Sequence, residues 1–126
     1  MKSEYLYDNE KEHIGKYENQ TIQNTKKNLD PYSDKIKYRV GYIPETLDNS
    51  APNEILYLHI DVNSAKTTDE ILQFFYPRLI GGGIILFDDY GWVSYNETRK
   101  IVNKFLNDKD GILFTSPTGQ AIFYKS

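Results

Sequence analysis

The chain has 126 residues, a length that suits one domain with a moderate hydrophobic core. Its 15 Lys and Arg residues against 18 Asp and Glu residues give a net charge of -3, so it lacks the basic excess that sequence-independent nucleic-acid binding requires. It contains no cysteine, which excludes disulfides, thiolate nucleophiles and Cys-ligated zinc.

The N-terminal segment is polar and charged. It begins MKSEYLYDNEKEH, without the apolar stretch of a signal peptide, and no apolar run in the chain approaches the roughly 20 residues of a membrane span. A soluble cytoplasmic protein with no membrane partner is therefore expected. Residues 1–17 are polar and have neither helical nor strand periodicity, which predicts an N-terminal loop before a domain over residues 18–126.

Short elements and a long connector are predicted in the first part of the domain. Residues 19–29 carry a thin apolar face at helical spacing, and Pro31 ends this predicted helix. Residues 37–40 alternate polar and apolar side chains before a glycine, which predicts a short strand. The connector that follows, residues 42–54, is rich in Pro, Asn and Ser, with one helical turn predicted at 44–47.

Two apolar runs separated by a helix form the centre of the domain. Residues 55–62 read as a strand buried on both faces. Thr67 and Glu70 then have the spacing of a capping box, which predicts a helix that begins at Thr68. A glycine turn is predicted at 81–83, before a second buried strand at 84–87. Strands joined by a helix in this way are expected to be parallel neighbours.

A helix and a hairpin are predicted to complete the domain. Ser94 and Glu97 repeat the capping-box spacing at the start of an amphipathic helix that extends to Leu106. Residues 111–116 and 121–125 are β-prone runs joined by a very short loop. A loop of this length requires the two strands to be antiparallel.

Three aspartates follow the two central strands. Asp61 ends the first strand, and Asp88 and Asp89 end the second, so their carboxylates should meet at the edge where open α/β sheets bind ligands. Like charges so close together repel, and a hard divalent cation such as Mg²⁺ would offset that repulsion. This pattern predicts a metal site. The alternative is that Asp61 and Asp88 cap the following turns while Asp89 is merely solvated.

Other side chains near this edge have two interpretations each. His59 would share a strand face with Asp61 and could accept a proton or assist a metal ligand, but a satisfied core histidine is favoured because it lies inside an apolar run. Tyr90 and Trp92 are predicted to wall a substrate pocket, or else simply to cover the sheet. The triple glycine at 81–83 leads into a strand, so it offers no helix N-terminus to a phosphate.

At these residues the sequence resembles the macrocin O-methyltransferase-like group of class I S-adenosylmethionine-dependent methyltransferases. The matching segments are GYIPETL at 41–47, LHIDVN at 58–63, FFYPRLIGGGIILFDDYGW at 74–92, RKIVNKFL at 99–106 and PTGQAIFYK at 117–125. The resemblance implies that Asp61, Asp88 and Asp89 hold Mg²⁺, which orients a substrate hydroxyl for methyl transfer. The sequence departs from the family at Ala65, where relatives often have tyrosine, and Tyr42 receives no cofactor role.

The resemblance also implies a fold class. It is an α/β, partial doubly wound (Rossmann-like) sheet of mixed direction that ends in an antiparallel hairpin, with strand order 3-2-1-4-5-7-6 in the complete fold. This chain would supply strands three to seven, without the first two strands, where the family holds S-adenosylmethionine. The strand at 37–40 would then be separated from the strand at 55–62, whose apolar edge would be left unpaired.

These inferences predict the C-terminal part of an S-adenosylmethionine-dependent, Mg²⁺-assisted O-methyltransferase. Its substrate would be a hydroxyl of a small molecule such as a sugar, and the chain alone would be an inactive part of the enzyme. The alternative is a non-catalytic remnant or split half that pairs through the open sheet edge, as a homo-oligomer or with a missing N-terminal half. A phosphoacceptor receiver domain is disfavoured. Such a domain requires the acidic pair on the first strand and the lone Asp on a later one, and the order here is the reverse.

Overall fold

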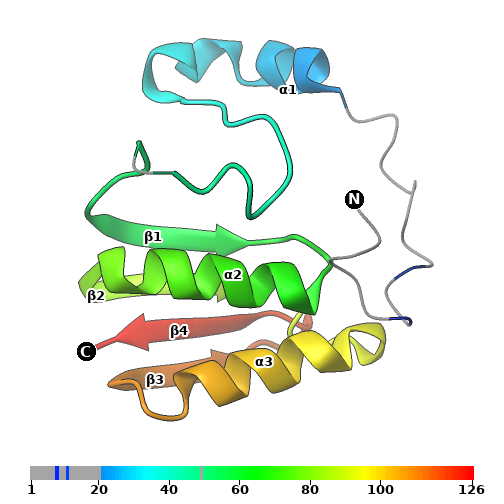
Figure 1. The fold of residues 1–126 in the computed structure, drawn as a ribbon, viewed down its shortest axis with the longest axis vertical. Helices are drawn as coiled ribbons and strands as arrows, with labels where there is room; N and C mark the ends of the chain where they lie inside the picture. Colours follow the sequence, from blue (N-terminus) through cyan, green and yellow to red (C-terminus); the bar gives the residue numbers. More distant parts are fainter. Residues whose placement is uncertain (1–7, 9–10, 12–20, 49) are drawn as a thin grey trace.

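The computed structural model describes residues 8, 11, 21–48 and 50–126. The predicted loop over residues 1–17 therefore lies almost entirely outside the described residues. In chain order the helices and strands are α1 (Ile22–Asn28), β1 (Ile55–Ile60), α2 (Ala65–Phe75), β2 (Leu79–Phe87), α3 (Asn96–Leu106), β3 (Gly111–Thr115) and β4 (Ala121–Lys125) (Figure 1). Short 3₁₀ helices cover Asp30–Lys35, Tyr76–Arg78 and Val93–Tyr95.

The strands form one mixed sheet in the order β1-β2-β4-β3. β1 and β2 are parallel, whereas β4 is antiparallel to both β2 and β3. The α/β class, the parallel central pair and the closing antiparallel hairpin are all confirmed. The order also agrees with that of the last four strands, 4-5-7-6, which the family resemblance implied.

Both α2 and α3 cover the same face of this sheet (Figure 1). The core lies between these two helices and the sheet, where Phe87 and Phe123 are fully buried against Leu72 of α2 and Val102 of α3. Burial of such side chains contributes roughly 1.5–3 kcal/mol each, so this interface is the main source of stability. No helix in the described part of the chain is long and apolar enough to cross a membrane.

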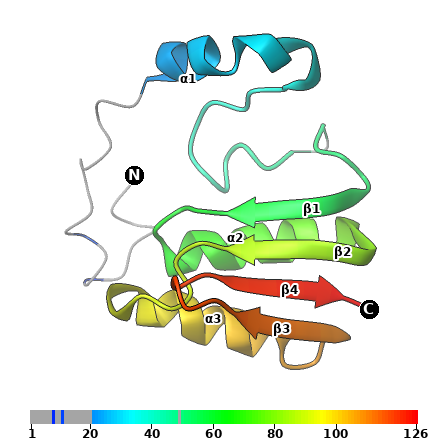
Figure 2. The same ribbon diagram turned by 180° about the vertical axis from the view of Figure 1, so that it is seen from behind.

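The opposite face of the sheet carries no helix among the described residues, as Figure 2 shows. Strand side chains alternate between faces, so the residues between the buried positions point to this side. The strand register aligns them in two rows across all four strands. We call this set the helix-free face: Tyr57, Ile84, Tyr124 and Ile112 in one row, and His59, Leu86, Ile122 and Phe114 in the other.

The segment before β1 differs in part from expectation. α1 confirms the first predicted helix, and the Thr21 hydroxyl caps it by accepting from the backbone N–H of Asn24 at 3.2 Å. The helical turn at 44–47 is confirmed by a bond from the N–H of Leu47 to the carbonyl of Pro44 at 2.9 Å. The strand predicted at 37–40 is wrong, because no described strand lies beside this segment to complete a ladder.

The predicted start of the next helix is also wrong. α2 begins at Ala65, three residues early, because the Ser64 hydroxyl is the N-cap and accepts from the N–H of Thr67 at 3.2 Å. α3 begins at Asn96 after a 3₁₀ turn, and its N-cap residue, Tyr95, makes no side-chain capping bond. Its predicted apolar face is confirmed nevertheless, with Val102 and Leu106 buried in the core.

The triple glycine lies inside β2 and does not form the predicted turn. Ile55 pairs with Leu79 and Tyr57 pairs with Ile84, so β2 bulges outward between these two pairs. Glycine is required in the bulge because Gly82 has a φ of +78°, and a Cβ at Gly83 would lie 2.8 Å from the carbonyl of residue 80. The sequence therefore indicated a backbone irregularity here, although not its place in a strand.

Candidate metal centre

The backbone places the predicted acids side by side. Ile60 and Phe87 are paired at the ends of β1 and β2. The N–H of Asp88 then donates to the carbonyl of Ile60 at 3.0 Å, which continues the parallel pairing one residue past the strand end. Because Asp61 directly follows Ile60, this bond fixes the start of the acidic pair next to Asp61.

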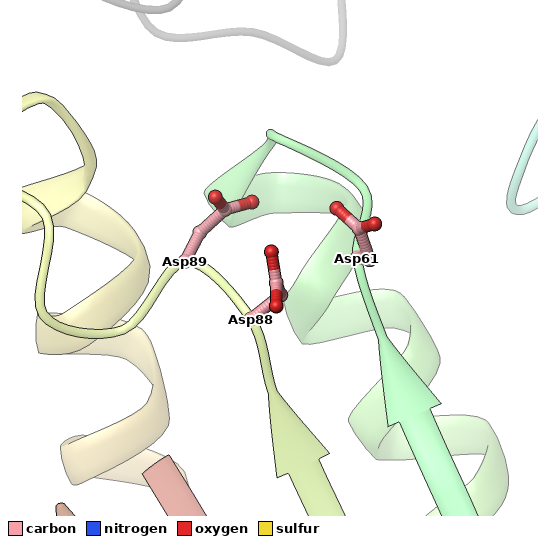
Figure 3. Close-up of side chains that lie close together, drawn as sticks. All are labelled: Asp61, Asp88 and Asp89. Carbon is pink, nitrogen blue, oxygen red and sulfur yellow. The ribbon is translucent and has the colours of Figure 1, made fainter. Parts of the chain in front are cut away.

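The three carboxylates converge in the space beyond the strand ends. Asp61, Asp88 and Asp89 each offer a carboxylate oxygen, and these oxygens lie within 4.8 Å of one another. Figure 3 shows the side chains of the three residues gathered around one point at the tips of β1 and β2. Asp61 is exposed, whereas Asp88 and Asp89 are half-buried. The structure thus brings together all three residues for which the sequence predicted a common site.

The electrostatics of this cluster suit a cation. Among the described residues, no Lys or Arg side chain forms an ion pair with Asp61 or Asp88. Two unit charges 4.8 Å apart repel by about 1 kcal/mol in water and about 3 kcal/mol at an effective dielectric constant near 20. Carboxylate oxygens are the donors that hard ions such as Mg²⁺ and Mn²⁺ prefer. The donor set therefore fits the metal implied by the resemblance.

His59 is exposed on the helix-free face, so its interpretation as a satisfied core histidine is wrong. The apolar run around it suggested burial on both sides, but in the described residues only the side under the helices is covered. Its ring centre lies 6.5 Å from that of Tyr57, at a tilted angle. Among the described residues, His59 is not part of the cluster that the three carboxylates form.

The two aromatic residues predicted to wall a pocket differ in their surroundings. Tyr90 is 5% exposed, and its hydroxyl donates to the Asn103 side-chain oxygen at 2.7 Å. The Arg99 guanidinium lies 5.5 Å from the centre of the same ring. Trp92, in contrast, is 55% exposed, with its indole lying against the backbone of Gly119. Of the two rings, that of Trp92 therefore offers surface to a ligand, and that of Tyr90 anchors the loop to α3.

Three polar residues of this region, Asn63, Tyr95 and Gln120, were not singled out from the sequence. Asn63, two residues after Asp61, has a φ of +50° and accepts a 2.6 Å hydrogen bond from the Tyr95 hydroxyl. An asparagine just after a strand is a recognisable signal, because Asn tolerates this left-handed conformation better than most residues. The Gln120 side chain, in the β3–β4 loop, donates to Asp88 at 3.2 Å. No local sequence pattern predicts that contact.

The described residues do not fit an S-adenosylmethionine site of the kind the resemblance implies. Such a site needs a glycine-rich turn between a strand and a helix. β1 is followed by Asp61, Val62 and Asn63, and β2 by the acidic pair, with no glycine-rich turn in either place. The glycines of β2 lie at its start, at the opposite end of the strand from the acids.

The fold and the acid cluster together define an α/β domain of the class I methyltransferase type, in which carboxylates meet at the carboxyl edge of parallel strands. A family comparison makes the assignment specific. The model for Macrocin-O-methyltransferase (TylF) matches residues 4–116, and the chain belongs to this family.

Individual relatives support the same assignment. The chain is 26% identical over 92 residues to mycinamicin III 3''-O-methyltransferase of Micromonospora griseorubida, a match that spans 73% of this chain and 35% of the relative. The solved O-methyltransferase NovP superposes with a TM-score of 0.79 and 17% identity, over 95% of this chain and 52% of its own. The apo structure of CalS11, a TDP-rhamnose 3'-O-methyltransferase in calicheamicin biosynthesis, superposes with a TM-score of 0.60 and 17% identity. That match covers 81% of this chain and 50% of CalS11. The chain thus spans about a third to a half of these relatives.

Proposed function

We propose that this chain supplies the metal-binding and acceptor-binding side of an S-adenosylmethionine-dependent O-methyltransferase. The observation that carries the proposal is the cluster of Asp61, Asp88 and Asp89 within the sequence frame of the family. CalS11 is a TDP-rhamnose 3'-O-methyltransferase, which supports a hydroxyl of a sugar or similar small molecule as the acceptor. Mg²⁺ is the proposed metal.

Each residue of the site has a chemical role in this proposal. The three carboxylates would hold the cation, which supplies positive charge that lowers the pKa of an acceptor hydroxyl. Trp92, three residues after Asp89, would contribute an exposed apolar wall against which the acceptor can be oriented. Tyr90 would hold the loop that carries both groups in place through its bond to Asn103. The contribution of the chain is therefore mainly positioning.

Metal binding by the chain itself tests the proposal. Mn²⁺ can replace Mg²⁺ in such a site, and its paramagnetic resonance separates free from bound ion. The wild-type chain is expected to bind one Mn²⁺ saturably, with competition by Mg²⁺. Asp61→Asn and Asp88→Asn are each expected to weaken binding at least tenfold, because each removes a charged ligand.

Asp34→Asn is the matched control for these two variants. Asp34 is exposed in the 3₁₀ helix Asp30–Lys35, outside the acid cluster, so the same charge change there should leave Mn²⁺ affinity unchanged. If the wild type fails to bind Mn²⁺ saturably, or if Asp88→Asn binds it as the wild type does, the metal role of the cluster is refuted.

S-adenosylmethionine should bind this chain weakly or not at all. The reason is that the described strands lack the glycine-rich turn on which such a cofactor rests. Isothermal titration of the 126-residue chain with S-adenosylmethionine is expected to give no measurable heat of binding in the micromolar range. A micromolar dissociation constant would show that this chain holds the cofactor by a route that the family resemblance does not suggest.

A second candidate function is pairing with another polypeptide through the edge of β1. In the described residues β1 is paired on one side only, and its exposed side chains include Leu56 at 63% and Tyr57 at 57%. The edge sequence ILYLHI contains no Lys, Glu or Pro to discourage pairing. Between the connector and the end of α2 there is also a cavity of about 690 Å³, lined in part by Ile43 and Phe75. The occupant that fits is a polypeptide that adds strands beside β1, because the solved relatives are about twice as long.

Light scattering combined with urea unfolding tests this candidate. If pairing is required, the purified chain should self-associate or unfold without a sharp cooperative transition, and Tyr57→Lys should reduce the association by placing a charge on the edge. A monomeric chain that unfolds in one cooperative transition would remove the need for a partner.

A further inference from the structure

The loop between β3 and β4 is bonded to the segment that carries the acidic pair. The side-chain amide of Gln120 donates from Nε2 to Oδ1 of Asp88 at 3.2 Å. On the other side of Tyr90, the N–H of Gly91 donates to the carbonyl of Gly119 at 2.6 Å. Two bonds from neighbouring residues of one loop therefore fix both the first acid of the pair and the chain that follows it.

The orientation of the Gln120 amide is determined by its neighbours. Its Oε1 accepts a hydrogen bond from the Thr118 hydroxyl, which in turn contacts the Ser116 hydroxyl. If the amide were reversed, Oε1 would face the Asp88 carboxylate, and two acceptors would oppose each other. The observed orientation satisfies both ends, because Oε1 accepts from Thr118 while Nε2 donates to the Asp88 carboxylate, which can only accept.

The Asp88 carboxylate is thereby held by one of its two oxygens. Its backbone is fixed by the bond from its N–H to the carbonyl of Ile60 at 3.0 Å, and Oδ1 is fixed by Gln120. Among the described residues no hydrogen bond engages Oδ2. Both the position and the rotation of this carboxylate are therefore set, and Oδ2 remains without a hydrogen bond among the described residues.

We propose that Gln120 is a positioning residue for the cation site, which orients the Asp88 carboxylate through the relay Ser116–Thr118–Gln120. The inference rests on the proposed function, because it takes Asp88 to be a metal ligand. Hydrogen-bond partners of metal ligands fix ligand orientation, and their loss usually lowers metal affinity by about 10- to 100-fold. The same loop supports Trp92 through Gly119, so it sets the metal ligand and the acceptor wall together.

Mn²⁺ binding to Gln120→Leu tests this role. Leucine keeps similar bulk but removes the amide donor, so Mn²⁺ affinity is expected to fall about tenfold or more, with a changed paramagnetic resonance spectrum of the bound ion. Thr118→Val should lower the affinity less, because the amide remains but loses the group that orients it. Gln73→Leu is the control, since Gln73 is an exposed residue of α2. It should bind Mn²⁺ as the wild type does.

The outcomes separate this inference from the proposed function. A merely structural role for Gln120 would lower the free energy of unfolding and leave the Mn²⁺ affinity and spectrum of the folded protein unchanged. That result, with saturable binding by the wild type and loss in Asp88→Asn, would overturn the positioning role alone. Absence of Mn²⁺ binding by the wild type would overturn the proposed function and this inference with it.

Discussion

Tyr90 directly follows the acidic pair, but its structural role is to attach the loop to α3. Its buried hydroxyl donates to Asn103, which lies on the exposed side of the helix. Tyr90→Phe removes one intramolecular hydrogen bond and is expected to lower the free energy of unfolding by about 1 kcal/mol. Chemical denaturation of the variant and the wild type measures this difference.

A double-mutant cycle with Asn103→Ala assigns the cost to the bond itself. Tyr90→Phe and Asn103→Ala should show a coupling energy of about 0.5–1.5 kcal/mol, because each removes the same interaction. Mn²⁺ affinity should fall less than in Asp88→Asn, since the loop loses one bond to α3 but no carboxylate is lost. Additive effects of the two changes would mean that the Tyr90 hydroxyl contributes to stability in another way.

At the scale of residues, the sequence predicted the acids but not the groups that hold them. Asp61, Asp88 and Asp89 end apolar runs, and parallel strands bring such ends together whatever the details of the register. The contact of Gln120 with Asp88 depends on β4 lying antiparallel beside β2, with Ala121 opposite Phe87. Because that pairing joins segments far apart in the chain, no local pattern could reveal it.

At the scale of elements, the structure shows which of two residues caps the start of α2. The sequence pattern pointed to Thr67 as the cap, whereas in the structure the Ser64 hydroxyl accepts from the N–H of Thr67. Ser64→Ala is expected to destabilise the protein by about 1 kcal/mol, the usual cost of losing an N-cap. The nearly isosteric Thr67→Val should cost less, since Thr67 is not the cap residue. Thermal unfolding of both variants measures the difference, and a larger loss in Thr67→Val would contradict the assignment of the cap.

Elements with a strong local pattern were predictable, and those that depend on a neighbour were not. The hairpin followed from the shortness of its loop, and α3 followed from its regular apolar face. The expected strand at 37–40 has a strand-like alternation but no partner among the described residues, and a strand is stable only within a ladder. The glycines of β2 indicated special backbone geometry, but whether that geometry is a turn or a bulge depends on the register with β1.

At the scale of the whole molecule, the uneven covering of the sheet is the main departure from a doubly wound fold. Such folds place helices on both faces, whereas α2 and α3 lie on one face here (Figures 1 and 2). NovP and CalS11 extend well beyond the part that this chain matches. Among the described residues, the helix-free face and the edge of β1 are left without a covering helix or strand.

The helix-free face can be tested by replacing two neighbouring side chains on it. Phe114 and Ile122 are paired across β3 and β4, and are 55% and 40% exposed. The double variant Phe114→Thr/Ile122→Thr keeps strand-favouring side chains but removes apolar surface. Self-association and binding of a hydrophobic dye are expected to decrease, because large exposed apolar patches drive both. The free energy of unfolding should change by no more than about 1 kcal/mol, as at other surface sites.

Leu72→Ala provides the contrast within the same molecule. Leu72 is a fully buried residue of α2 in the core, so this change should cost about 2–5 kcal/mol. If the double threonine variant is destabilised as strongly as Leu72→Ala, Phe114 and Ile122 are packed against something in the isolated chain, and the face is not open. If instead its stability is kept and self-association falls, the apolar face is a surface that the folded chain presents for contact. Light scattering and urea unfolding of the wild type, the double threonine variant and Leu72→Ala distinguish these results. Only if the face is open will self-association fall while the free energy of unfolding stays the same.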